Sequence, residues 1–351
     1  MPNEPKHVCE RVCAILDEIR PDIVHIWGTE FKWTSIFEQG YIHYPCFVDM
    51  QGVLTPCVDV YYADLQGKER RTTSFGWPDL LHLRTSHWWR QHNMKQRADK
   101  ERRQLPQFSH ISVQSNFVAC SLNAFAPEVK LLRTGIILRQ EFYLADNLRF
   151  EQDTPPRLFT IASNFDIPFK GLHTILKALT LMQRQYPDIE LWMAGKSLRS
   201  GIHASGYERW INSYIDNNGL HSHIRQLGPL SASQMLLAMQ QCTMGIVPSF
   251  VESYCLGLAE MMMAGMACVT ARSGAMPELA EDGSEALFYE AGDAAALAQK
   301  ASTLIENADL RVSLGQAARL RRLHDNDPKA IIQQQIRNYK AILNEELIVK
   351  K

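Results

Sequence analysis

Residues 248–265 read PSFVESYCLGLAEMMMAG, and this stretch decides how the rest of the chain is interpreted. The apolar run before it, at 244–247, predicts a buried strand that ends at Pro248. After a turn, the stretch continues as a helix with almost no polar face. Such a helix is normally buried, and a carboxylate inside it is costly unless a partner hydrogen bonds it. Glu260 is that carboxylate, and no basic residue lies near it in sequence. A ligand with hydroxyl groups would satisfy it.

A second carboxylate, Glu252, lies in the turn before this helix. The turn is followed by the N-terminus of a helix, whose first backbone N–H groups lack partners within the helix and favour an anion such as phosphate. Hydroxyl groups combined with phosphate indicate a nucleotide. The alternative is a surface residue at a helix start for Glu252 and a salt-bridged core residue for Glu260. The apolar helix favours a function for both.

Composition and charge narrow the class of protein. A length of 351 residues predicts two domains. A composition of 46% hydrophobic and 21% charged residues is typical of a globular protein. The net charge of −1 argues against a nucleic-acid partner. The eight cysteines form no C-x-x-C pair, so we expect reduced, buried thiols in a cytoplasmic protein. No apolar run reaches the ~20 residues of a membrane-spanning helix.

Apolar strand patterns alternate with helical patterns, which predicts an α/β fold with parallel sheets. The polar, proline-containing segment 149–157 predicts a linker, and residues 53–77 are expected to be irregular. We therefore predict two facing Rossmann-like lobes, 1–148 and 158–327, and a C-terminal helix at 328–351 with the option of packing back on the first lobe. The expected strands are 23–27, 46–50, 111–113 and 129–132, then 158–162, 189–194, 224–227, 244–247, 267–270 and 286–289.

Two further motifs carry chemistry. The stretch NFDIPFKG at 164–171 lies between an expected strand and a helix, and a lysine beside a glycine at a helix start can neutralise phosphate. By itself this pair, Lys170 and Gly171, is also a common helix-entry pair. The turn GAMPE at 274–278 follows another expected strand.

In this order and spacing, the motifs resemble the retaining family-4 (group 1) glycosyltransferases of two-lobed GT-B architecture. The resemblance covers nearly all of 158–346 and, more loosely, 20–145. Its most specific part is the pair Glu252-x7-Glu260 after Pro248, followed by the glycine turn. It implies transfer of a sugar from a nucleotide-sugar to a glycan or lipid-linked acceptor with retention of anomeric configuration.

The resemblance also implies a role for each matched residue. Glu252 and Lys170 would be catalytic, with Glu252 beside the transferred sugar and Lys170 stabilising the departing diphosphate. Glu260 would accept hydrogen bonds from the donor ribose. Neither a metal nor a cofactor is expected, since Lys170 and a helix N-terminus can stabilise the leaving group electrostatically. The other donor-binding residues implied are Asn164, Gly171, Gly228, Tyr254, Cys255 and Leu256, with backbone N–H groups of residues 254–256 binding phosphate.

In the first lobe, the stretch WGTE at 27–30 and the pair Gln51-Gly52 resemble enzymes of bacterial surface-polysaccharide assembly. Glu30, Gln51 and Gly52 would lie on the acceptor side. The family often has histidine in place of Gln51, whose amide cannot act as a base and would only orient a substrate. For Glu30 and Gln51, a satisfied turn residue is an equal alternative.

Two departures from the family leave alternatives open. Asn164 stands where the family usually has a basic residue, and the chain begins where a fourth strand is expected, so the first lobe is predicted to be shortened at its N-terminus. The lobe would then be incomplete, completed by a partner, or reduced. The alternative functions are an inactive nucleotide-sugar-binding or partner subunit, and another GT-B enzyme such as an epimerase or phosphorylase.

Residues 84–103 contain seven Lys or Arg against two Asp or Glu, with Trp88 and Trp89 near one end. One interpretation is contact with an anionic membrane surface or a lipid-diphosphate acceptor. This would place a cytoplasmic protein at the inner face of a membrane. The other interpretation, a solvated helix face, is slightly favoured.

Overall fold

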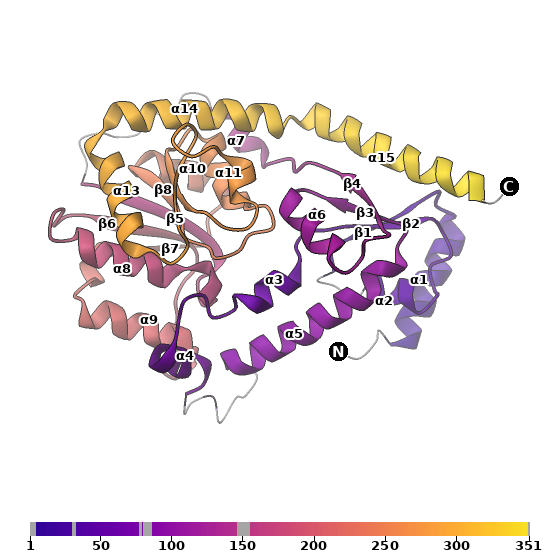
Figure 1. Ribbon diagram of the computed structural model, residues 1–351, viewed down its shortest axis with the longest axis horizontal. Helices are drawn as coiled ribbons and strands as arrows, with labels where there is room; N and C mark the ends of the chain where they lie inside the picture. The colour runs from indigo at the N-terminus through magenta and orange to yellow at the C-terminus, as the bar shows by residue number, and fades with distance from the viewer. Residues whose placement is uncertain (1–4, 30–32, 77–78, 80–85, 146–154, 350–351) are drawn as a thin grey trace. The chain divides into compact units, whose positions relative to one another are not determined.

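The structure, a computed structural model, describes residues 5–29, 33–76, 79, 86–145 and 155–349 (Figure 1). The chain forms two compact units, each built from separate stretches of sequence. The first unit contains residues 1–59, 93–137 and 326–351, and the second contains residues 60–92 and 138–325.

The second unit is built on a parallel sheet of six strands within the described residues, in the order β10-β9-β8-β5-β6-β7. Parallel neighbours require a crossover connection, and helices provide these connections here. The strands are β5 (Arg157–Asn164), β6 (Glu190–Lys196), β7 (Ile224–Gly228), β8 (Met244–Val247), β9 (Cys268–Ala271) and β10 (Leu287–Tyr289).

The strand order of this sheet reverses its direction between β5 and β8. From β5 the chain adds β6 and β7 on one side, and from β8 it adds β9 and β10 on the other. In open parallel sheets, ligands bind at such a switch point, outside the carboxyl ends of the strands. The loops after β5 and β8 are therefore where the fold places a binding site.

Helices of the second unit pack against one another around the sheet. Helix α8 (Leu172–Met182) packs against α13 (Ala294–Glu306), and α11 (Leu256–Met263) packs against α14 (Ala308–Asp325) (Figure 1). Residues 258–263 of α11 are all buried, as its apolar sequence predicts. The other helices are α4 (Gly67–Ser74), α7 (Gln140–Leu144), α9 (Gly206–Asn217), α10 (Ala232–Gln240) and α12 (Met276–Leu279).

The first unit contains a second parallel sheet, in the order β1-β2-β3-β4. Its C-terminal helix α15 (Pro328–Val349) contacts β4, where the Asn338 side chain donates a 2.8 Å hydrogen bond to the Arg133 carbonyl. The strands are β1 (Val24–Trp27), β2 (Cys46–Asp49), β3 (His110–Val113) and β4 (Lys130–Arg133). The helices before α15 are α1 (Lys6–Ile19), α2 (Trp33–Glu38), α3 (Leu54–Asp59) and α6 (Asn116–Asn123), with α5 (His87–Gln104) beginning in the second unit.

The predicted α/β class with parallel sheets is confirmed, and each described strand overlaps an expected one. The expectation of irregular structure at 53–77 is wrong, because α3 and α4 form there. The units are bounded differently from the expected lobes 1–148 and 158–327, because residues 60–92 and 138–145 belong with the second unit. The helix predicted at 328–351 belongs with the first unit. None of the described helices is long and apolar enough to cross a membrane.

Buried polar contacts explain why residues 60–92 belong with the second unit. The His87 imidazole lies 3.0 Å from the Tyr61 hydroxyl and 3.2 Å from the Ser205 hydroxyl. The Asp64 carboxylate lies 2.6 Å from Nε2 of His173, and Asp79 pairs with Arg209 at 3.0 Å. A partner missing from such a buried network would leave a costly unsatisfied group.

This network predicts a loss of stability at acid pH. Burial lowers the pKa of His87 to about 3 from 6.5, so only the unfolded chain gains this proton as the pH falls through 6.5. The free energy of unfolding should therefore fall between pH 6.5 and 3, by up to about 1.4 kcal/mol per pH unit for this residue. Burial also lowers the pKa of His173, which acts in the same direction.

Urea unfolding at pH 7 and pH 5 measures this effect. The His87→Gln variant should show a smaller pH dependence than the wild type, whereas His221→Gln, a change at a side chain 74% exposed, should keep the wild-type dependence. Equal dependence in all three proteins would contradict the prediction.

Candidate functional site

The two loops at the switch point are in direct contact. The loop after β5 ends at Gly171, where φ is +74° and an added Cβ would overlap the carbonyl oxygen of Pro248. On the same loop, the Phe169 carbonyl accepts a 2.8 Å hydrogen bond from the Phe250 backbone N–H. Only glycine fits this approach without strain, so Gly171 sets the spacing between the loops.

This contact brings the two predicted catalytic residues together. Nζ of Lys170 donates to Oε1 of Glu252 at 2.6 Å, and the Ser249 hydroxyl donates to the same oxygen at 2.7 Å. The side chains of Lys170 and Glu252 are only 22% and 17% exposed, so they are partly shielded from water. Their geometry is compatible with catalysis, whereas their catalytic roles stay predictions.

The glycine turn at 274–278 supports this pair from the other side. At Gly274, φ is +53° and a Cβ would overlap the backbone of Glu252. The Ala275 N–H donates to the Glu252 carbonyl at 2.8 Å, and the Ser273 hydroxyl donates to the Ser249 carbonyl at 2.6 Å. The glycine turn therefore positions the opening stretch 248–265, which carries Glu252.

Helix α11 begins next to this pair. Cys255, in the left-handed region at φ 80°, precedes the first helical residue, Leu256, which is 51% exposed. The first backbone N–H groups of a helix lack partners within it and favour an anion. Burial raises the pKa of the Cys255 thiol, which therefore stays neutral and unreactive. Tyr254 lies half-buried just before this helix start.

Glu260 has a basic partner that is distant in sequence, so it forms the salt bridge named above as the alternative interpretation. Nε of Arg139 donates to Oε1 of Glu260 at 2.7 Å, and Nη2 donates to Oε2 at 2.6 Å. The Glu260 side chain is 8% exposed and that of Arg139 is 40% exposed. The hydrogen bond and the charge of Glu260 raise the pKa of Arg139. Sequence patterns could not reveal this partner, because 121 positions separate the two residues.

The ion pair is compatible with the predicted role of Glu260. An ionised carboxylate has about four acceptor positions, and a bidentate guanidinium occupies two of them. The remaining positions can still accept ribose hydroxyls. Arg139 would then fix the orientation of the carboxylate, which makes it a positioning residue that the sequence reasoning missed.

A second charged cluster lies on the loop after β5. The Asp166 carboxylate pairs with Arg90 at 2.9 Å and with Arg199 at 3.1 Å, and its backbone N–H donates to the Asn164 side chain at 3.1 Å. Burial alone would raise the pKa of Asp166, but the hydrogen bond and charge of Arg90 lower it. Arg90 belongs to the basic segment 84–103, so at least this cation pairs within the protein.

The other predicted residues belong to other elements of the chain. Gly228 ends the edge strand β7, with φ +73° and open space where a Cβ would be. Gln51 is exposed and Gly52 is half-buried, both in the first unit after β2. Glu30 lies outside the described residues. The described part of the chain contains no group of three or more His, Cys, Asp or Glu that could hold a metal.

The sheets and the switch-point site define the class: an α/β protein of GT-B architecture. Two solved structures share this fold, a glycosyltransferase from Rickettsia africae (TM-score 0.69, 16% identity, 98% of this chain and 84% of that one) and Anabaena Alr3699/HepE in complex with UDP-glucose (TM-score 0.65, 17% identity, 97% and 84%).

The family follows from sequence. Residues 147–321 match the model described as "Glycosyl transferases group 1", and this part of the chain belongs to that family. A D-inositol 3-phosphate glycosyltransferase from Corynebacterium glutamicum is 26% identical over 151 residues, which are 43% of this chain and 36% of the relative. The chain spans about a third of the length of the first curated relatives it matches.

Proposed function

We propose that this chain transfers a sugar from a nucleotide-sugar to a glycan or lipid-linked acceptor, with retention of anomeric configuration. The observation that carries the proposal is the convergence of Lys170 and Glu252 at the switch point of the sheet, beside the N-terminus of α11. Such a site offers a cation and helix N–H groups to a diphosphate, and carboxylates to sugar hydroxyls.

In this proposal the chemistry is electrostatic. Lys170 and the first turn of α11 stabilise the negative charge that develops on the diphosphate as its bond to the sugar breaks. Glu260, oriented by Arg139, accepts hydrogen bonds from the ribose. The acceptor hydroxyl attacks the face that the diphosphate leaves, which retains the configuration of the sugar.

The acceptor side is also part of the proposal. Gln51 and Gly52 would orient the acceptor, and the remaining cations of segment 84–103 would contact an anionic membrane surface or a lipid diphosphate. Co-sedimentation with vesicles that contain anionic lipid, before and after neutralisation of Arg97, Arg102 and Arg103, tests the membrane contact.

Donor binding is tested first, because a ligand that binds only the folded state raises the melting temperature. UDP-glucose is the first probe, since the Anabaena structure is a complex with it, and other nucleotide-sugars follow. We expect a donor to raise Tm by several degrees at about 100 times its Kd. Glu260→Ala should abolish the rise, and Arg139→Ala should weaken donor binding about tenfold.

Asp309→Ala removes an exposed carboxylate at the start of α14 in the same unit and is the matched control. It should keep the wild-type response. An unchanged response in Glu260→Ala, or none of the nucleotide-sugars raising Tm in the wild type, would overturn the donor site.

The uncharged Asn164 favours one second candidate, a nucleotide-sugar-binding subunit without transferase activity. It places an amide where the family usually has a cation, and its side-chain oxygen already accepts from Asp166. This candidate predicts a normal thermal shift with a donor but neither transfer nor donor hydrolysis by the purified chain.

A further inference from the structure

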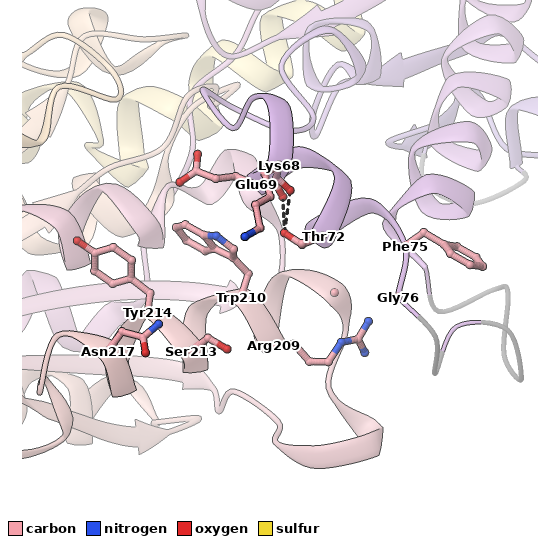
Figure 2. A pocket seen from close by; sticks show the side chains of 11 residues that line it. Lys68, Glu69, Thr72, Phe75, Gly76, Arg209, Trp210, Ser213, Tyr214 and Asn217 are labelled. Atoms are coloured by element: carbon pink, nitrogen blue, oxygen red, sulfur yellow. Dashed lines mark hydrogen bonds between the residues drawn. The ribbon is translucent and has the colours of Figure 1, made fainter.

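A cavity of about 590 Å³ lies between α4 and α9 in the second unit (Figure 2). Its volume is in the range of small-molecule sites, and none of its lining residues belongs to the candidate donor site. The cavity is lined by Lys68, Glu69, Thr72, Phe75, Gly76, Gly206, Arg209, Trp210, Ser213, Tyr214 and Asn217.

Two aromatic rings on α9 form one wall of this cavity. The ring centroids of Trp210 and Tyr214 are 5.6 Å apart, and both side chains are half-buried. The third ring of the row, Tyr207, is fully buried and stacks on Trp210 with 7° between their planes. A ring held in this way presents a rigid, electron-rich surface. The C–H groups of a pyranose, which carry partial positive charge, pack well on such a surface.

Polar side chains surround the aromatic wall, and their charges balance. Lys68 and Glu69 of α4 offer one charge of each sign, while Arg209 is already paired with Asp79 at 3.0 Å. The ammonium group of Lys68, the hydroxyl of Ser213 and the amide of Asn217 also line the cavity. These groups can both donate to and accept from hydroxyls. Because the charges of the lining side chains balance, the cavity favours a neutral ligand over a charged one.

We propose that this cavity binds a short segment of neutral oligosaccharide, as a glycan-binding subsite separate from the donor site. Aromatic rings on one wall, side-chain donors and acceptors around them, and balanced charge are together the chemistry that recognises a polyhydroxylated, uncharged chain. The inference rests on the proposed function in that a transferase acting on glycans would meet such a ligand.

One contact path determines which variants can test the proposal. The Trp210 ring lies edge-on to His173, with centroids 6.2 Å apart, and His173 stacks on Phe250 at 5.7 Å. Phe250 is on the same loop as Glu252, so a change at Trp210 can also disturb the donor site. Ser213 is exposed and lies outside this path of ring contacts, so a bulky charge there blocks the cavity alone.

The test measures binding of maltotriose and mannotriose by saturation-transfer NMR and calorimetry, with a sulfated trisaccharide as the charged comparison. We expect the wild type to bind at least one neutral trisaccharide, and Ser213→Arg and Trp210→Leu to weaken that binding about tenfold or more. Trp88→Leu removes a tryptophan that is 57% exposed, in the same unit but outside the cavity, and should bind as the wild type does.

The shift of Tm with UDP-glucose separates this proposal from the proposed function. Ser213→Arg should keep the donor response of the wild type while losing the trisaccharide. No binding of either neutral trisaccharide, equal binding by Ser213→Arg, or preference for the sulfated sugar would overturn the subsite. Trisaccharide binding that Ser213→Arg abolishes, together with no donor response in any protein, would support the subsite and overturn the transferase.

Discussion

Replacing Lys170 by methionine is expected to slow sugar transfer by about 100- to 1,000-fold, the usual cost of removing one donor that stabilises developing charge. Methionine keeps most of the length and volume of the side chain but cannot donate to Glu252, whose Oε1 lies 2.6 Å from the lysine Nζ. The bound diphosphate already carries negative charge, and a further negative charge develops on it only as its bond to the sugar breaks. Steady-state kinetics should therefore show a fall in kcat with little change in KM for the donor.

Lys177→Met is the matched control for this change. Lys177 lies on α8 with a side chain 28% exposed, close to the 22% of Lys170, and its Nζ lies 3.7 Å from Asp64. A partly exposed pair at this distance contributes little, so kcat should stay within about twofold of the wild type. Equal losses in the two variants, or a nearly wild-type kcat in Lys170→Met, would remove Lys170 from the catalytic machinery.

The second large effect is expected from Gly171→Ala. The left-handed backbone at φ +74° costs an alanine about 1–2 kcal/mol, and the added Cβ would also overlap the Pro248 carbonyl. We expect a total loss of about 2–4 kcal/mol in the free energy of unfolding. Because relief of the overlap must move the two loops apart, Lys170 and Glu252 should separate and donor binding should be lost as well.

Gly219→Ala separates the cost of the left-handed backbone from the cost of the overlap with the Pro248 carbonyl. Gly219 has a similar φ of +65°, but nothing lies within 4 Å of an added Cβ. The control should therefore lose only the backbone cost of about 1–2 kcal/mol and keep donor binding. Urea unfolding and the thermal shift with a donor measure both properties. If Gly171→Ala lost no more stability than Gly219→Ala and bound the donor normally, the close approach of the loops would not matter for the site.

The sheets could be predicted from the sequence because their signals are local. Strand β8, for example, is a short apolar run that ends where Pro248 breaks it. The regions the prediction missed lack such a signal: α4 has the polar sequence GKERRTTS, and only Thr73 of its residues is buried. Its position depends on contacts with distant residues, since the backbone carbonyl of Thr73 fits only against glycine at position 206.

The residues of the candidate site also fall into two groups: those with a local sequence signal and those without one. Lys170, Glu252 and the glycine turn could be predicted because each lies directly after a strand, and the carboxyl ends of parallel strands share one edge of a sheet. The partners of Glu260 and Asp166 could not be predicted, because Arg139 and Arg90 lie 121 and 76 positions away in the chain. Pairing at such separations depends on tertiary packing, for which a single sequence carries no periodic pattern.

During synthesis, residues 60–92 leave the ribosome before any strand of the six-stranded sheet has been made. The side chains of Asp79 and His87, which are buried in the folded protein, must then remain solvated until Arg209 and Ser205 have emerged. Domains usually fold as units while the chain grows. Here the second unit cannot complete its fold until most of the protein has been made. The first unit cannot complete its fold until residues 326–351 have been made. Nascent chains of this layout should therefore spend longer in contact with chaperones than two domains encoded one after the other.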